Sequence, residues 1–257
     1  WVLKLYGFDS EASFADFLKN KKFIIDAGCG LGYKAAWMAE LAPHAIVFGA
    51  DFSEAAVVAA KRYAHINNLF FVRADIADLP FKPGRFDFIL CDQVIHHTEN
   101  PRSTYLHLTE LLNNGGSMAC YVYAKKALPR ELLDDYFRKA THNFSHEQMW
   151  EFSDQLTELG KRLSELSVSF DCPDIPALGI KGGTYDIQRF IYWNFLKCFY
   201  HPGWTKGEND SCNFDWYTPS NAERYTPDQF KQWSLDANLK IDFFRSEEAA
   251  HTSLATK

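Results

Sequence analysis

The chain has 257 residues, of which 47% are hydrophobic and 23% charged, and its formal net charge at pH 7 is −6. This composition predicts a packed globular core and excludes an intrinsically disordered chain. The negative charge argues against a nucleic-acid partner, because phosphate backbones attract cationic proteins. No apolar run approaches the roughly 20 residues of a transmembrane helix, so we expect no membrane segment.

The cysteines and the first residue bear on the compartment and on the limits of the chain. No secretory leader is visible, and the chain starts at Trp1 without a methionine, which we interpret as a truncation. The cysteines show no Cys-x-x-Cys spacing, so we expect reduced thiols of a cytoplasmic protein and no structural zinc site. They are Cys29, Cys91, Cys120, Cys172, Cys198 and Cys212.

The first half of the chain alternates short apolar runs with helical patterns. Such alternation predicts a doubly wound α/β fold with a mostly parallel sheet. Helices are expected at 33–41 and 54–67. The expected strands are 22–26, 45–50, 70–73, 86–91 and 117–123.

The alternation stops at Lys125 and resumes at Thr226, where a capping box and a proline start a helix. Two strands near 240–245 and 252–256 would complete a sheet of seven. The stretch between is too long for an ordinary loop, so we expect a largely helical insertion after strand 5. One predicted helix of this insertion begins at the capping box of Ser145. Another is predicted to span residues 185–200.

The chain therefore divides into four predicted segments. Residues 1–21 are expected to form an N-terminal lid, and residues 22–124 a ligand-binding α/β core. Residues 125–225 are the aromatic-rich insertion, interpreted as a substrate cap, and residues 226–257 complete the core.

A glycine-rich turn follows the first predicted strand and reads Asp26-Ala-Gly-Cys-Gly-Leu-Gly32. Glycines in such a turn let a ligand approach the backbone closely. The dinucleotide fingerprint needs a glycine where this chain has Tyr33. The spacing therefore favours a ligand without a pyrophosphate.

Acidic residues stand at the ends of the next three strands, at Asp51, Asp75 and Asp92. The carboxyl ends of parallel strands line the crevice in which α/β proteins bind ligands. With Asp26 they form a set of four, which indicates a cationic ligand that contains a nucleoside.

Further motifs accompany the glycine turn and the acids. They are Asp51-Phe-Ser53, Ala74-Asp-Ile76, Leu79-Pro-Phe81, Phe86-Asp-Phe88, Ile95-His-His97 and Gly115-Gly116. Over residues 22–123 and again over 226–256, the sequence resembles the class I S-adenosylmethionine-dependent methyltransferases, in particular the UbiE-like, type 11 group that acts on small molecules.

The resemblance implies S-adenosylmethionine as the cofactor and S-adenosylhomocysteine as the product. It places the glycines at the amino-acid portion of the cofactor, Asp51 at the ribose, Asp75 and the Ile76 amide at the adenine, and Asp92 with Gln93 at the methionine moiety. The full predicted cofactor set is Asp26, Gly28, Cys29, Gly30, Gly32, Asp51, Phe52, Asp75, Ile76, Asp92 and Gln93.

His96 and His97 follow the fourth strand, where a general base could remove a proton from the methyl acceptor. We favour His97 over His96 as a catalytic or substrate-orienting residue; the alternative is that one of them packs or caps the next turn. No third ligand is recognisable nearby, so we expect no metal site.

The insertion supplies candidates for a substrate wall, because several side chains there combine apolar surface with a directional polar group. They are Arg189, Tyr192, Trp193, Asp215, Trp216 and Arg224. Arg189 or Arg224 could hold a carboxylate or phosphate. Phe190, Phe195 and Phe214 are assigned to packing. At the other end of the chain, Tyr6 is a candidate cation–π partner of the sulfonium or simply packs on the sheet.

The sequence thus predicts methyl transfer to a small-molecule acceptor, with neither nucleic acid nor membrane as a partner. An NAD(P)-dependent oxidoreductase and a non-catalytic S-adenosylmethionine-binding protein are the alternatives. Methyltransferases that act on nucleobase amino groups typically carry an Asn/Asp-Pro-Pro-aromatic motif, and here that place reads Asp92-Gln-Val-Ile95. The acceptor and the oligomeric state are not predicted.

Overall fold

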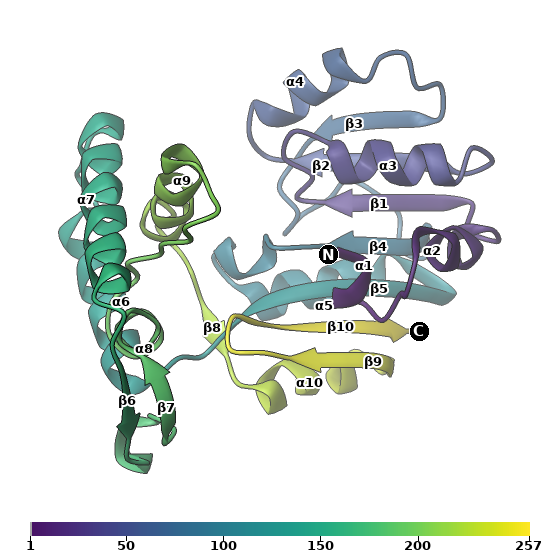
Figure 1. Cartoon of the computed structure of the whole chain (residues 1–257). Helices are drawn as coiled ribbons and strands as arrows, with labels where there is room; N and C mark the ends of the chain where they lie inside the picture. Colours follow the sequence, from purple (N-terminus) through teal and green to yellow (C-terminus); the bar gives the residue numbers. More distant parts are fainter. Residues whose placement is uncertain (1) are drawn as a thin grey trace. The chain divides into compact units, whose positions relative to one another are not determined.

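The computed structural model describes residues 2–257, which divide into two compact units (Figure 1). The core unit ends its first part at Ala124 and resumes with Glu223–Lys257; the insertion unit is Lys125–Ala222. The core resumes three residues before the predicted boundary at 226, because Arg224 and Tyr225 pair with the sheet.

The core unit contains one sheet whose strand order is β3-β2-β1-β4-β5-β10-β9, with the short β8 paired to β5. Its strands are β1 (Phe23–Ala27), β2 (Ile46–Asp51), β3 (Leu69–Arg73), β4 (Phe86–Cys91), β5 (Leu112–Ala124), β8 (Arg224–Tyr225), β9 (Lys240–Ser246) and β10 (Ala250–Thr256). β1 to β5 pair in parallel, and β10 is antiparallel to both of its neighbours. The predicted seven-stranded, mostly parallel sheet is confirmed, and β8 adds a two-residue strand.

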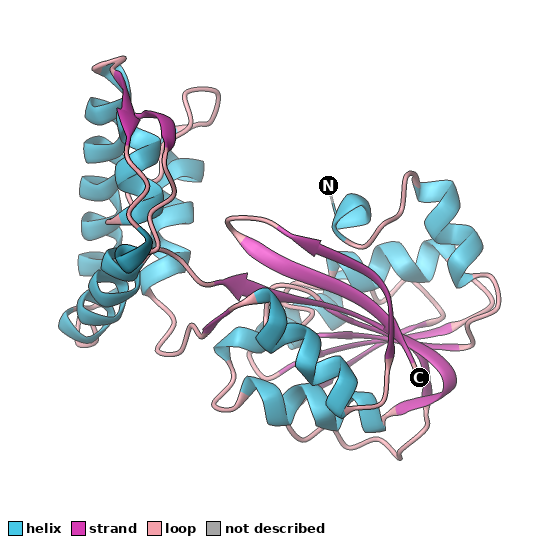
Figure 2. Ribbon diagram, turned by 90° about the horizontal axis from the view of Figure 1, so that it is seen from below, coloured by secondary structure: helices cyan, strands magenta, loops and turns pink. Residues whose placement is uncertain are grey.

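Helices cover both faces of this sheet (Figure 2). They are α1 (Val2–Leu5), α2 (Glu11–Leu18), α3 (Tyr33–Leu41), α4 (Ala55–Arg62), α5 (Pro101–Glu110) and α10 (Pro227–Asp236), with the 3-10 helix η1 (Ile95–His97). On one face, α5 and α10 bury Tyr105 and Phe230 against Phe86 of β4. On the other, α1 to α3 pack around Phe88 of β4. Both phenylalanines are fully buried, and the register of β4 against β5 shifts between them.

The predicted helix at 33–41 is confirmed, whereas the helix predicted at 54–67 is wrong at its C-terminal end. That helix, α4, stops at Arg62, and Tyr63 leaves helical geometry at φ −105° and ψ 20°. The chain must turn there to enter β3. The Asn68 side-chain amide holds the turn by donating to the carbonyls of Ala39, Ala42 and Ala45.

The insertion unit is helical with one small hairpin. Its elements are α6 (Leu128–Ala140), α7 (His146–Glu165), β6 (Ser169–Cys172), η2 (Pro176–Leu178), β7 (Gly183–Asp186), α8 (Ile187–Asn194) and α9 (Lys206–Tyr217). The predicted capping boxes at Ser145 and Thr226 are confirmed. None of the helices within residues 2–257 has the length and apolar character needed to cross a membrane.

The helix predicted at 185–200 is wrong at both ends. Tyr185 lies in β7, which pairs with β6, and Asp186 caps α8 through the Arg189 amide. At the other end Phe195 takes φ −135°, outside helical geometry. The pairing of β7 with β6 involves a segment outside the predicted helix, so the local periodicity of residues 185–200 does not reveal it. The same periodicity does not show that α8 ends at Asn194.

Helix α6 turns its charged side inward. Arg130 and Asp134 are 1% and 0% exposed, whereas Leu132 and Tyr136 are 63% and 66% exposed. The Arg130 Nε lies 2.7 Å from Asp134, which also accepts a hydrogen bond from Tyr217 at 3.0 Å. A helix normally buries its apolar stripe, so the interior of the insertion unit is polar on this side.

Replacing Asp134 by alanine should destabilise the protein by about 3–5 kcal/mol, because Arg130 would keep a buried charge without its carboxylate. Urea unfolding followed by circular dichroism measures this change. The exposed pair of Arg162 and Glu158 is the matched control, since it has the same four-residue spacing and the same 2.7 Å separation. Glu158→Ala should cost less than about 1 kcal/mol. Equal losses of stability in Asp134→Ala and Glu158→Ala would show that the buried pair of Arg130 and Asp134 contributes no more than an exposed pair.

Candidate cofactor-binding site

The glycine turn after β1 is shaped by packing and leaves one open position. A Cβ at Gly28 would lie 2.5 Å from the Val94 side chain, and one at Gly32 would lie 2.7 Å from Phe71. All three glycines of the turn have positive φ, at +83°, +51° and +81°. At Gly30, by contrast, nothing among the described atoms lies within 4 Å of a Cβ. The backbone of Gly30 is therefore open to close approach by a ligand.

Asp26, near the end of β1, carries a fully buried carboxylate. Within residues 2–257, neither of its oxygens accepts a hydrogen bond of normal geometry. Burial raises the pKa of Asp26 to about 7, against the opposing effect of the Lys34 ammonium. A buried carboxylate in this state is stabilised by a cationic donor, so the position fits the ammonium end of an amino acid.

Asp51, the last residue of β2, holds the turn in place. Its Oδ2 accepts the Gly30 amide at 2.9 Å, and its Oδ1 accepts both the amide and the hydroxyl of Ser53, at 2.9 and 2.6 Å. A carboxylate offers about four acceptor positions, so one remains for a further donor at Oδ2. A diol with two donors would displace the Ser53 hydroxyl or share its position.

Asp92 follows β4 and is bound from three sides. Tyr6 donates its phenol hydrogen at 2.6 Å, the Lys34 ammonium lies at 2.8 Å, and the Gln93 amide donates at 3.2 Å. Burial and the Asp92 charge raise the pKa of Tyr6 well above its ordinary value, so the phenol stays protonated. Although burial opposes it, the charges of Asp26 and Asp92 raise the pKa of Lys34. Gln93 has a positive φ of 64°, a conformation that a non-glycine residue rarely adopts outside turns and functional sites.

Lys34 was not singled out from the sequence. It stands in the first turn of α3, where the helix dipole disfavours a cation. This electrostatically unfavourable position is the feature of the sequence that could have identified Lys34 as a site residue. The structure explains it, because Lys34 lies beside the carboxylates at the ends of β1 and β4.

Asp75, Ile76 and Phe52 follow the ends of β3 and β2. The Asp75 carboxylate accepts the Ala77 amide at 2.9 Å and is exposed, while Ile76 is buried at 5%. Phe52 is 74% exposed. Because β2 and β3 are paired, with Asp51 opposite Arg73, these residues lie at the same edge of the sheet as the glycine turn.

The two histidines of η1 differ in exposure. His96 is fully buried, with its ring 3.7 Å from that of Tyr123 and 4.2 Å from that of His97. Neither of its nitrogens makes a hydrogen bond of normal geometry in the described part of the chain. Burial, together with His97, lowers the pKa of His96 well below its ordinary value, so this ring stays neutral. His97 is partly exposed, which makes it the more accessible of the two candidates.

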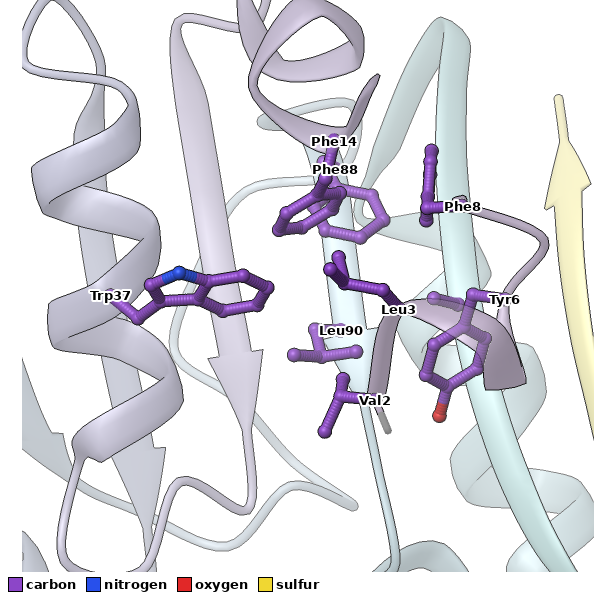
Figure 3. A pocket seen from close by; sticks show the side chains of 9 residues that line it. Val2, Leu3, Tyr6, Phe8, Phe14, Trp37, Phe88 and Leu90 are labelled. Atoms are coloured by element: carbon purple, nitrogen blue, oxygen red, sulfur yellow. The ribbon is translucent and has the colours of Figure 1, made fainter. Parts of the chain in front are cut away.

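Tyr6 belongs to an apolar pocket between the N-terminal segment and the sheet (Figure 3). Its phenol oxygen points away from the other aromatic side chains of the pocket, toward Asp92. Packing and a polar contact are thus combined in Tyr6, which is 3% exposed. The pocket is lined by Val2, Leu3, Tyr6, Phe8, Phe14, Trp37, Phe88, Leu90 and Ala119.

The predicted substrate residues fall in both units. Arg189, Tyr192 and Trp193 lie on α8, and Asp215 and Trp216 lie on α9 of the insertion unit. Arg224 was assigned to the insertion, which is wrong: it is in β8 of the core unit, opposite Tyr123. No group of histidine, cysteine and acidic side chains suited to a metal ion occurs within residues 2–257.

The phenylalanines assigned to packing do pack. Phe190 contacts the rings of Phe170 and Phe195 at 4.8 and 5.7 Å. Phe214 stacks on Trp150 at 4.4 Å.

Among curated proteins, a ubiquinone biosynthesis O-methyltransferase of Coxiella burnetii is 27% identical over 199 residues, 70% of this chain and 77% of that protein. An uncharacterised Synechococcus protein is 33% identical over 106 residues, 40% of this chain and 25% of its own length. A tRNA U34 carboxymethyltransferase of Campylobacter fetus is 37% identical over 108 residues, 40% of this chain and 37% of that protein. The chain thus spans from a quarter to about three quarters of these relatives.

Two solved structures share the fold at low sequence identity. A methyltransferase of Methanosarcina mazei, described as SAM-dependent, is 16% identical with a TM-score of 0.52, covering 97% of this chain and 99% of that one. PKMT2 of Rickettsia typhi, in complex with AdoHcy, is 17% identical with a TM-score of 0.59, covering 91% of this chain and 48% of that one.

A family model described as a methyltransferase domain matches residues 18–166, more than half of the chain. The match includes the glycine turn, the Asp51 carboxylate that holds it and the acids that follow β3 and β4. The protein belongs to this methyltransferase domain family and is a class I S-adenosylmethionine-dependent methyltransferase.

Proposed function

We propose that the protein transfers a methyl group from S-adenosylmethionine to an oxygen or nitrogen atom of a small-molecule acceptor and releases S-adenosylhomocysteine. The observation that carries the proposal is the buried, unsatisfied Asp26 carboxylate beside the open backbone of Gly30. The ammonium group of the ligand would pair with the Asp26 carboxylate. An unbranched part of the ligand would lie against the Gly30 backbone.

The remaining cofactor contacts are proposed from the geometry at the strand ends. Gly28 and Gly32 give the turn its shape, Asp51 offers its remaining lone pair to the ribose, and Asp75 with the Ile76 amide meets the adenine. Cys29, Phe52, Asp92 and Gln93 complete this surface. When bound, the cofactor supplies an electrophilic methyl group on a sulfonium.

Methyl transfer by in-line displacement needs alignment of donor and acceptor more than covalent participation of the protein. The proton released by a hydroxyl or ammonium acceptor needs a base, and His97 is the proposed one. His96 packs beneath Tyr123 and is proposed to orient its neighbour. Residues 1–21, with Tyr6, are proposed to exclude water from one side of the site.

A small-molecule acceptor is favoured over nucleic acid. The Coxiella relative, with the longest aligned region of the three, is named for ubiquinone biosynthesis, and the net charge of this chain is −6. The Campylobacter relative is named for tRNA but aligns over only 40% of this chain. All six cysteines are free, which agrees with a cytoplasmic location.

Release of S-adenosylhomocysteine with a panel of phenolic, catecholic and heteroaromatic acceptors tests the function. We expect turnover with at least one acceptor, and His97→Ala should lower kcat while S-adenosylmethionine affinity stays nearly unchanged. His44→Ala is the control, because His44 is exposed. Full activity of His97→Ala would remove it as the base. Cofactor binding without turnover on any small molecule would favour a non-catalytic role, and tight NADH binding in its place would favour an oxidoreductase.

Asp51→Ala should weaken S-adenosylmethionine binding, because each charge-assisted hydrogen bond to the ribose contributes about 1.5–3 kcal/mol. The dissociation constant should rise at least about tenfold by isothermal calorimetry. Ser53→Ala removes one contact of the same carboxylate without removing its charge, and serves as the control. An unchanged affinity in Asp51→Ala would refute the ribose assignment.

The affinity for S-adenosylmethionine should fall as the pH drops through about 7, the pKa of Asp26, because a cationic ligand binds the ionised carboxylate better. Binding at pH 6 should be about tenfold weaker than at pH 8, as the ionised fraction falls from about nine tenths to one tenth. The effect of pH on folding stability has the opposite direction. Because folding raises the pKa of Asp26, raising the pH from about 4 to 7 lowers the stability of the ligand-free protein. Asp26→Asn should bind with little pH dependence. Identical pH profiles of Asp26→Asn and the wild type would contradict the assignment.

A further inference from the structure

Three cationic side chains surround the ring of Tyr192 in the insertion unit. The charged groups of Arg130, Arg189 and Lys197 lie 5.4, 5.5 and 5.7 Å from its centroid. Lys197 and Arg130 also lie 4.8 and 5.2 Å from the ring of Trp216. We call Arg130, Arg189 and Lys197 the Tyr192 cation cluster.

The acidic groups near this cluster are unevenly placed. Asp134 lies 2.7 Å from the Nε of Arg130 and also accepts the Tyr217 hydroxyl. Asp215 interacts electrostatically with Lys197. The backbone amide of Arg189 donates to Asp186, but the Arg189 guanidinium has no carboxylate partner in the described part of the chain and faces the rings of Tyr192 and Phe199.

Packing alone does not account for this arrangement. Arg130 and Lys197 are 1% and 7% exposed, and bringing like charges together in a poorly hydrated interior is unfavourable. Helix α6 places Arg130 inside although Leu132, two residues on, is 63% exposed. Burial lowers the pKa of Lys126 to about 7, and the charges of Arg130 and Lys197 act in the same direction. The charges of Glu131 and Asp134 oppose this shift with a smaller effect, so the two cations dominate the charge environment of Lys126.

We infer that the Tyr192 cation cluster is an oxyanion-binding site that recognises a carboxylate or phosphate group of the methyl acceptor. The assignment to the acceptor rests on the proposed function; the oxyanion site itself does not. Arg189 is the proposed entry point, since it is partly exposed and its planar guanidinium can bind an oxyanion through two parallel hydrogen bonds. The adjacent faces of Phe199 and Trp193, both partly exposed, suit an apolar or aromatic body attached to that group.

The test is thermal unfolding of the full chain at constant ionic strength with inorganic phosphate or benzoate added up to 10 mM. We expect at least one of them to raise Tm saturably by about 2–4 °C, as binding to the folded state alone predicts. A phosphate response would indicate a phosphorylated acceptor and a benzoate response an aromatic carboxylate. Arg189→Gln should abolish the response, and Arg189→Lys, which keeps the charge, should retain part of it.

Without added anion, Arg189→Gln should have a Tm equal to or above that of the wild type, because removing one of three neighbouring cations relieves repulsion. If Arg189 served only to stabilise the fold, Arg189→Gln would instead have a lower Tm than the wild type. Arg162→Gln on the exposed face of α7 is the matched control and should keep the wild-type anion response.

The inference is overturned if neither anion raises the Tm of the wild type by more than it raises that of Arg189→Gln, or if Arg189→Gln lowers Tm in the absence of anion. Calorimetry with S-adenosylmethionine and S-adenosylhomocysteine release are measured in parallel on the same samples. An anion response without turnover would leave the oxyanion site standing and remove the proposed function. Turnover without an anion response would support the proposed function and remove the oxyanion site.

Discussion

The Gly30 amide donates a hydrogen bond of 2.9 Å to the Asp51 carboxylate, joining the turn after β1 to the end of β2. Because these strands are paired in parallel, their carboxyl ends meet at one edge, where ligands of α/β proteins bind. The bond fixes a backbone that packing at Gly28 and Gly32 already confines. A ligand that reaches the site therefore meets a turn that is already formed, and little ordering accompanies binding.

Charge is balanced incompletely at this edge, and that imbalance suits the cofactor. Asp26 and Asp92 share Lys34 as a neighbouring cation, and Asp26 accepts no hydrogen bond of normal geometry among the described residues. S-adenosylmethionine carries a sulfonium and an ammonium against one carboxylate, so its net charge complements the site. Tyr6 closes the network from the N-terminal segment, which links the order of that segment to Asp92.

The insertion unit shows the opposite imbalance. Arg130 and Lys197, both buried, and the partly exposed Arg189 surround Tyr192, and α6 is turned so that its charged side is buried. Taking charges out of water is costly, and departures from the usual burial pattern are expected at functional sites. Each unit thus has its own charged cluster: acidic at the strand ends of the core, and cationic around Tyr192 in the insertion.

The sequence by itself determined the parallel sheet, the glycine turn and the acids at the strand ends, because the pattern of apolar runs and turn residues is local. It also located the helix starts at Ser145 and Thr226, since a capping box needs only neighbouring residues. The tertiary structure alone decided that α8 stops at Asn194, that Arg224 pairs with β5, and that Lys34 meets Asp92, 58 residues away along the chain. These features depend on contacts between distant segments, and local patterns do not specify the partners that such residues meet.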